Sequence, residues 1–181
     1  MSDSSRLNLA DFIRTFPDFP KPGILFYDTV SLLTKPKAFR EAIRQIIERL
    51  GDAKIDAVAA AEARGFFFAA PLALEMDVPL VAIRKAGKLP GKTVSYSYEL
   101  EYGADTLEIQ ADALSKGDRV LVVDDLLATG GTIEACCHLV EKAGGTVVAC
   151  AFIIELLGLG GADKIANYKH ISLLEYECNE P

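Results

Sequence analysis

The sequence predicts an α/β protein with a mostly parallel, twisted sheet that is flanked by helices. Its strand candidates are continuous apolar runs without alternation, which is typical of strands buried on both faces. Stretches in which apolar residues recur at helical spacing separate these runs. The chain has 181 residues, half of them hydrophobic, and this length predicts a single domain over residues 1–181.

The first half of the chain supplies alternating helix and strand candidates. Helical spacing of apolar residues predicts helices over residues 9–16 and 37–50, and a stretch with three prolines and a glycine separates them. A buried strand is expected from residue 55 to the loop at Glu62. A helix containing Pro71 follows at 66–76, and a short strand at 79–85.

The second half continues the pattern. Residues 93–110 alternate around a Tyr-Gly turn and predict a β-hairpin. An apolar strand is expected at 118–125, and a helix closed by two glycines at 132–145. A further buried strand is expected at 146–156. Ligands of such sheets bind beyond the carboxyl ends of the strands, which draws attention to the segments that follow them.

Composition favours a cytoplasmic protein that binds neither nucleic acid nor membranes. The net charge of −7 opposes nonspecific binding to these anionic partners. No apolar run approaches the ~20 residues of a membrane helix, and the first residues contain no secretion signal. The cysteines, at positions 136, 137, 150 and 178, lack metal-ligand spacing, so reduced buried thiols are favoured over a metal site.

One segment is basic although the protein is acidic. Val78 to Tyr98 contain no acid, yet Arg84, Lys85, Lys88 and Lys92 lie within this range. Such a segment suits a small anionic ligand that is bound locally. A solvated surface loop explains the same charges equally well.

The stretch VLVVDDLLATGGT, residues 120–132, carries the strongest chemical signal. Small residues from Ala128 to Gly131 let backbone N–H groups approach an anion, and the start of a helix near Thr132 favours a phosphate there. Asp124 and Asp125 cannot bind phosphate, but carboxylates accept hydrogen bonds from sugar hydroxyls and hold the waters of Mg²⁺. The stretch therefore predicts a ribose 5-phosphate site. A strand end with a turn is the alternative, and the glycines at 158–161 are interpreted as a plain turn.

Several segments, in order, resemble the adenine phosphoribosyltransferases of the type I phosphoribosyltransferase family. Residues 120–132 are similar to the signature of the whole type I group. FPDFPKPGILF (16–26), EARGF (62–66), IRKAGKLPG (83–91) and ELEYGADTLEI (99–109) accompany it. The first and last of these point to adenine. The resemblance implies a type I fold with an N-terminal hood over the base (1–34) and a β-hairpin lid (84–110).

The activity implied by this resemblance is that of a pentosyltransferase in purine salvage. Ribose 5-phosphate would pass from 5-phosphoribosyl-1-pyrophosphate to adenine, giving AMP and pyrophosphate. The implied cofactor is Mg²⁺, bound through substrate and water with no direct protein ligand, and the implied assembly is a homodimer. A closing lid would exclude water from the activated sugar.

The resemblance also implies a role for individual residues. Asp124 and Asp125 would take the ribose hydroxyls, and the phosphate loop, here Ala128, Thr129, Gly130, Gly131 and Thr132, would hold the 5′-phosphate. The pyrophosphate loop, here Glu62, Ala63 and Arg64, would contain a cis peptide between its first two residues. Pyrophosphate would also meet Arg84, Lys85, Lys88 and Tyr102, while Glu101 would handle a proton near the purine unless it is simply an exposed strand residue.

Adenine would be recognised by the hood, through the backbone of Leu25 and Tyr27 with Phe26 as packing. The sequence departs from the family here, because many members have arginine where Tyr27 stands. Rival hypotheses are a phosphoribosyltransferase for another base and a regulator that senses phosphoribosyl pyrophosphate without catalysis. A phosphoribosyl pyrophosphate synthetase is disfavoured because no ATP site is visible.

Overall fold

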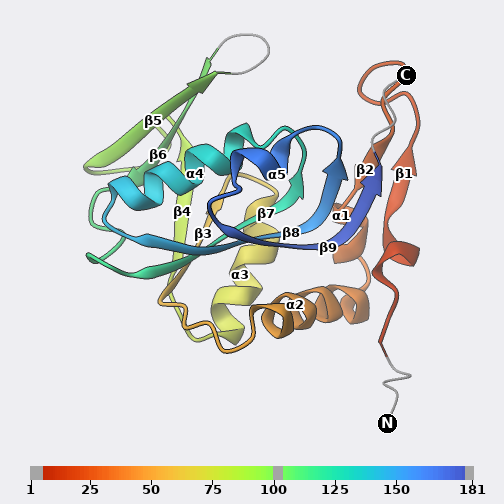
Figure 1. Ribbon diagram of the computed structural model, residues 1–181, viewed down its shortest axis with the longest axis horizontal. Helices are drawn as coiled ribbons and strands as arrows, with labels where there is room; N and C mark the ends of the chain where they lie inside the picture. Colours follow the sequence, from red (N-terminus) through yellow and green to blue (C-terminus); the bar gives the residue numbers. More distant parts are fainter. Residues whose placement is uncertain (1–5, 100–103, 178–181) are drawn as a thin grey trace.

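The computed structural model describes residues 6–99 and 104–177, and a seven-stranded sheet forms its centre (Figure 1). The strands lie in the order β5–β6–β4–β3–β7–β8–β9. The five from β4 to β9 in this order pair in parallel, and β6 pairs antiparallel with β4 and β5. Their bounds are β3 Ala57–Ala61, β4 Leu80–Lys85, β5 Thr93–Glu99, β6 Ala104–Gln110, β7 Arg119–Leu127, β8 Thr146–Leu157 and β9 Lys169–Glu177.

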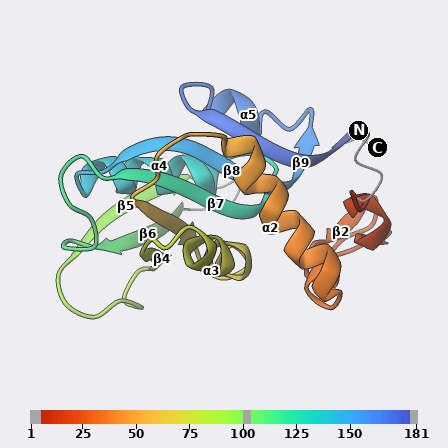
Figure 2. The same ribbon diagram turned by 90° about the horizontal axis from the view of Figure 1, so that it is seen from below.

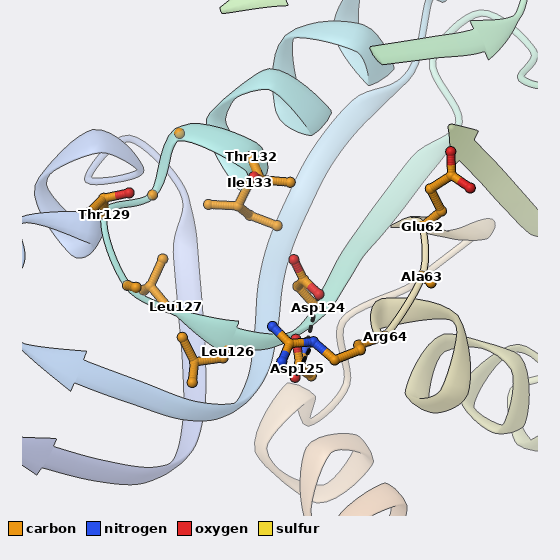
Figure 3. Close-up of a pocket in the computed structure, with 13 residues that line it drawn as sticks. Glu62, Ala63, Arg64, Asp124, Asp125, Leu126, Leu127, Thr129, Thr132 and Ile133 are labelled. Atoms are coloured by element: carbon orange, nitrogen blue, oxygen red, sulfur yellow. Dashed lines mark hydrogen bonds and ion pairs between the residues drawn. The ribbon is translucent and has the colours of Figure 1, made fainter. Parts of the chain in front are cut away.

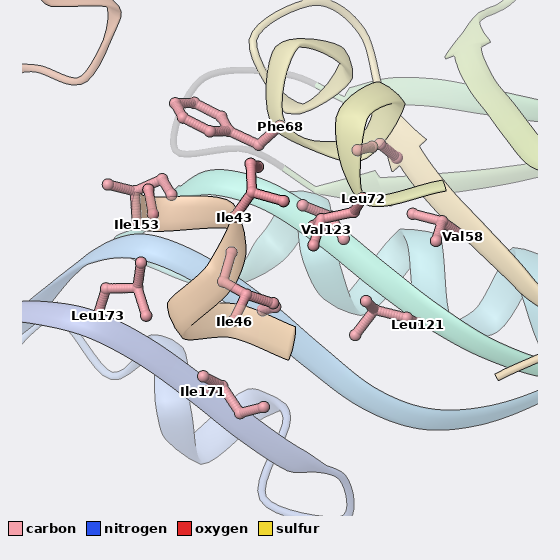
Figure 4. Close-up of a cluster of buried hydrophobic side chains, with 14 of the residues drawn as sticks. Ile43, Ile46, Val58, Phe68, Leu72, Leu121, Val123, Ile153, Ile171 and Leu173 are labelled. Atoms are coloured by element: carbon pink, nitrogen blue, oxygen red, sulfur yellow. The ribbon is translucent and has the colours of Figure 1, made fainter. Parts of the chain in front are cut away.

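Helices cover both faces of the sheet (Figure 2). Helices α2 (Pro36–Leu50) and α3 (Gly65–Glu75) lie on one face, and α4 (Gly131–Lys142) and α5 (Gly161–Lys164) lie on the other. Successive side chains of a strand point to opposite faces of the sheet, so β3 contributes residues to a hydrophobic core on each face. Val58 and Ala60 pack with α2 and α3, as Figure 4 shows for Val58, whereas Ala57, Ala59 and Ala61 pack with α4. The mostly parallel sheet predicted from the sequence is confirmed.

The N-terminal segment differs from the prediction of one helix over residues 9–16. A short 3₁₀ helix, η1, covers Leu9–Phe12, and β1 (Arg14–Phe16) then pairs antiparallel with β2 (Phe26–Asp28). The intervening prolines turn the chain back, so that Arg14–Phe16 finds a strand partner that local spacing does not reveal. A one-turn helix, α1 (Val30–Leu33), follows β2.

The remaining expected elements are present, and after β2 the structure contains three further elements that were not predicted. The expected helices, hairpin and apolar strands occur within a few residues of the expected bounds. The helices are those expected at 37–50, 66–76 and 132–145, and the hairpin is the one expected at 93–110. The C-terminal strand β9 and the short helices α1 and α5 are additional. Strand β9 closes the far edge of the sheet against β8.

Candidate active site

A cavity of about 280 Å³ opens where β3 and β7 end (Figure 3). These strands are parallel neighbours, so their carboxyl ends meet at one edge and the loops that follow them face each other. Ten residues that the sequence predicted for the site line the cavity: Glu62, Ala63, Arg64, Asp124, Asp125, Ala128, Thr129, Gly130, Gly131 and Thr132. Leu126, Leu127 and Ile133 complete its lining.

The phosphate loop leads directly into α4, which begins at Gly131. Gly130 has a φ of 78°, a left-handed conformation that glycine adopts without steric cost. The free N–H groups and positive dipole end of this twelve-residue helix face the loop. The hydroxyl oxygens of Thr132 and Tyr98 lie 3.3 Å apart, so the hairpin also contacts the loop. The loop contains no lysine, but its backbone N–H groups and the helix dipole can bind an anion.

A second glycine segment, residues 158–161, supports the phosphate loop from outside the cavity. A Cβ atom at Gly161 would overlap the carbonyl oxygen of Ala128, and one at Gly130 would lie 2.8 Å from the carbonyl oxygen of Gly161. Neither position leaves room for an ordinary carbon–oxygen contact. The segment was interpreted from the sequence as a plain turn, and it is a turn into α5. Its backbone also fixes the path of the phosphate loop.

Asp124 and Asp125 occupy different environments although they are adjacent. Asp125 is 2% exposed, and its Oδ2 atom accepts a hydrogen bond from Thr29 Oγ1 at 2.6 Å. The same atom lies 3.2 Å from Arg64 Nε (Figure 3). Asp124 Oδ1 accepts the backbone N–H of Asp125 at 2.8 Å. Burial, and then the negative charge of Asp125, raise the pKa of Asp124 above its ordinary value. A ligand that donates hydrogen bonds to Asp124 would relieve this cost.

The peptide between Glu62 and Ala63 is cis, in agreement with the family resemblance. The Glu62 carboxylate accepts the backbone N–H of Lys85 at 2.7 Å and the Arg84 guanidinium at 2.9 Å. These two interactions lower the pKa of Glu62. Glu62 therefore connects the pyrophosphate loop to the end of β4, where the basic segment begins.

The basic segment is adjacent to the cavity but does not line it. Acids from elsewhere in the chain neutralise part of its charge: Arg84 pairs with Glu62, and Lys85 Nζ lies 3.0 Å from Asp105 of β6. The backbone carbonyl of Lys88 accepts a hydrogen bond from Arg84. The absence of acids between Val78 and Tyr98 in the sequence thus did not imply an unpaired cluster.

The predicted base-binding residues lie on β2 and just before it, outside the cavity. Leu25 is exposed. The guanidinium carbon of Arg64 lies over the Phe26 ring, 6.0 Å from the ring centroid. The Tyr27 ring stacks on Tyr176 of β9 with the centroids 4.4 Å apart. The Tyr27 side chain therefore anchors the hood to the C-terminal strand. Phe16, Phe19, Phe26 and Asp28 line a separate hollow of about 290 Å³.

Four residues near the site were missed by sequence reasoning: Thr29, Tyr98, Gly161 and Tyr176. Each contacts a predicted residue that is distant along the chain, so spacing gave no signal; only the glycine cluster at 158–161 was visible. Glu101 and Tyr102 lie outside the described residues. Within residues 6–99 and 104–177, no group of three or more potential metal ligands occurs, and no helix has the length and apolar character needed to span a bilayer.

Comparisons with known proteins agree with this geometry. The phosphoribosyl transferase domain family matches residues 29–181, which include the whole cavity. An adenine phosphoribosyltransferase of Maridesulfovibrio salexigens is 53% identical over 169 residues, 93% of this chain and 99% of the relative. The solved adenine phosphoribosyltransferase of Thermoanaerobacter pseudethanolicus has a TM-score of 0.89 at 50% identity, covering 93% of this chain and all of that one.

A more distant solved structure is similar over most of the chain. The adenine phosphoribosyltransferase of Trypanosoma brucei, in complex with AMP, pyrophosphate and ribose-5-phosphate, has a TM-score of 0.84 at 26% identity. The match covers 92% of this chain and 77% of that one.

Proposed function

Because the chain belongs to the phosphoribosyltransferase family and its relatives are adenine phosphoribosyltransferases, we propose how its residues divide the work of that reaction. The protein transfers ribose 5-phosphate from 5-phosphoribosyl-1-pyrophosphate to adenine and releases AMP and pyrophosphate. The observation that carries the assignment is one cavity that joins two carboxylates to a glycine loop at a helix N-terminus.

The phosphate loop holds the 5′-phosphate, and the two acids beside it hold the ribose. Backbone N–H groups of residues 128–132 face a phosphate at the positive end of α4. Asp124 and Asp125 accept hydrogen bonds from the ribose hydroxyls. Arg64 lies between Asp125 and the Phe26 ring, where it meets pyrophosphate. Arg84 and Lys85 release Glu62 and Asp105 to bind the same group, and the side chain of Lys88 approaches it with them.

Mg²⁺ fits this site as a cofactor held through the substrate. In phosphate sites Mg²⁺ keeps several waters and binds one or two carboxylates together with phosphate oxygens. Asp124 and Asp125 would hold waters of the ion beside the phosphate loop, and the described residues contain no group of three or more potential ligands that would hold a metal without the substrate. When bound, Mg²⁺ neutralises charge on the pyrophosphate.

The reaction breaks the bond between the anomeric carbon and pyrophosphate and forms a bond from that carbon to an adenine nitrogen. The proton on that nitrogen must leave, and Glu101 is the candidate for handling it. The sugar carries positive charge in the transition state, a feature shared with glycoside cleavage. The acids stabilise this charge, while the basic side chains stabilise the departing pyrophosphate. The hood places adenine through the backbone of Leu25 and Tyr27.

Residues 84–110 act as a lid over the reacting sugar. Strand β5 packs against α4, where the Tyr96 ring stacks on His138 and Lys142 Nζ donates to the carbonyl of Ser95. The Tyr98 hydroxyl lies beside Thr132 of the phosphate loop. A ligand in that loop can therefore alter the packing of the hairpin directly.

Hydrogen exchange should detect this lid. Protection of amides from Lys88 to Gln110 is expected to rise with Mg²⁺ and phosphoribosyl pyrophosphate, because the anion attracts the basic residues, and to rise much less with adenine alone. Amides of β8 serve as the internal control. Equal exchange of the hairpin with and without the sugar substrate would show a static hairpin.

The protein forms a homodimer through α3 and the adjacent surface of α2. Phe67, Pro71 and Leu74 recur at helical spacing on α3, and Leu74 is 83% exposed. Beside them is an apolar hollow of about 640 Å³ whose lining includes Phe39, Ile43 and Ile47 of α2. Exposed apolar patches of this kind mark protein–protein interfaces.

Leu74→Glu is expected to shift the protein to monomers and to lower its activity, since it buries a charge in the interface. Light scattering across a concentration series reports the oligomeric state. Ala111→Glu adds the same charge at another exposed position and should leave the assembly unchanged. Identical mass for both variants would argue against this interface.

A cytoplasmic location is also proposed. It is supported by the free, buried thiols of Cys136, Cys137 and Cys150, since such thiols are typical of proteins in a reducing compartment.

A single assay tests the function. Purified protein with adenine, phosphoribosyl pyrophosphate and Mg²⁺ should form AMP and pyrophosphate, and chelation of Mg²⁺ should stop the reaction. Hypoxanthine, guanine and xanthine should neither react efficiently nor compete with adenine. Turnover of one of these bases in preference to adenine would reassign the substrate, and binding of the sugar substrate without turnover would favour a sensor.

A further inference from the structure

Thr29 lies between the hood and the catalytic acids. It follows β2 directly and occupies the N-cap position of α1. Threonine at this position commonly accepts a hydrogen bond from a backbone N–H of its own helix. Thr29 makes no such bond; its hydroxyl instead donates to Asp125 Oδ2 at 2.6 Å. The local capping interaction has been exchanged for a contact with a residue 96 positions away.

The contact is fully enclosed. Thr29 is 1% exposed and Asp125 is 2% exposed, so water does not replace a missing donor easily. The oxygen that receives the Thr29 hydroxyl is also the one nearest to Arg64 Nε, at 3.2 Å. Three separate segments therefore meet at one carboxylate oxygen: the end of the hood, the pyrophosphate loop and the end of β7.

We propose that Thr29 is a positioning residue, which fixes the Asp125 carboxylate for the ribose and couples the placement of the hood to it. The inference rests on the proposed role of Asp125. With Oδ2 held by Thr29 and Arg64, the orientation of the carboxylate is set before the sugar binds. The same bond ties the end of β2, and with it the base-binding backbone, to the ribose site.

Two substitutions at Thr29 test this role, because one removes the hydroxyl and the other removes the methyl group. Thr29→Val keeps the shape and removes the donor, and it should lower kcat/KM for both substrates by about tenfold or more, the effect of losing one hydrogen bond to a charged group. Thr29→Ser keeps the donor and should retain most of the activity. A packing role predicts the reverse order, with the valine variant active and the serine variant impaired. That order would overturn the proposal.

A double-mutant cycle with Asp125→Asn shows whether Thr29 acts through Asp125. The Thr29→Val effect on kcat/KM should largely disappear in the Asp125→Asn background, because coupled residues are non-additive. Additive effects would contradict the proposal. Full activity of Asp125→Asn alone would instead contradict the proposed role of Asp125, on which this inference rests, and would leave the overall reaction unchallenged. Circular dichroism and thermal unfolding verify folding, and if Thr29→Val does not fold, Thr29→Ala against Thr29→Ser makes the same comparison of donor and no donor.

Discussion

Asp125→Asn is expected to lower kcat/KM for phosphoribosyl pyrophosphate by about tenfold to a hundredfold. The substitution keeps the shape of the side chain and removes its charge, which weakens hydrogen bonds worth ~1.5–3 kcal/mol when charged. About 1.4 kcal/mol corresponds to one factor of ten in rate. It also leaves Arg64 beside a neutral amide in place of its carboxylate partner. Steady-state kinetics with each substrate varied in turn measure the loss.

Asp56→Asn is the matched control for this experiment. Asp56 lies before β3, at the opposite end of the strands from the cavity, and its carboxylate binds the Arg119 side chain at 2.6 Å. The same acid-to-amide change there should reduce stability and leave kcat/KM near that of the unmodified protein. Full activity of both Asp124→Asn and Asp125→Asn would refute the ribose assignment.

Asp124→Asn should lower activity and stabilise the ligand-free protein. Burial and the charge of Asp125 raise the pKa of Asp124 above the 3.8 that it has when unfolded. Above pH 3.8 the unfolded chain ionises at this position before the folded protein does, so stability falls as the pH rises toward the raised value. Asparagine at position 124 does not ionise, so the variant does not lose stability in this way as the pH rises. The Tm advantage of the variant should therefore grow between about pH 4 and pH 8, and a constant difference would show that the raised pKa is not its cause.

Gly161→Ala is expected to raise the KM for phosphoribosyl pyrophosphate by about a hundredfold, the cost that a displacement of ~1 Å has at a positioned site. The new Cβ atom would overlap the carbonyl oxygen of Ala128. Backbone occupies both sides of this contact, so the phosphate loop must move and its N–H groups leave the positions that bind phosphate. The KM for adenine should change much less, because the hood is not in this contact.

Gly160→Ala provides the control for the neighbouring position. Gly160 has a φ of 74° and open space where a Cβ atom would be placed. Alanine there costs roughly 1 kcal/mol of backbone strain without a clash. The stability of the Gly160→Ala variant should fall, while its KM values for both substrates stay unchanged. A folded Gly161→Ala protein with an unchanged KM for the sugar substrate would show that the two glycine segments do not depend on each other.

The sequence by itself determined the elements whose signal is local. The spacing of apolar residues over 37–50 marks one helix face, and the run before Asp124 marks a strand buried on both faces. The order of strand, two acids, small residues and helix lies within residues 120–132, so it was predictable that the two acids and the glycine loop would lie together at the start of a helix. The resemblance added the pyrophosphate loop and its cis peptide, which the structure contains.

Only the tertiary structure decided which distant residues complete the site. Arg14–Phe16 became a strand because Phe26–Asp28 was available as its partner. Arg84 and Lys85 found acids at positions 62 and 105, and the Thr29 hydroxyl reached Asp125 across the chain. Gly161 lies so close to the backbone of Ala128 that a Cβ atom has no room there. Periodicity and composition report how far each residue is buried, but the identity of its neighbour depends on how the whole chain packs.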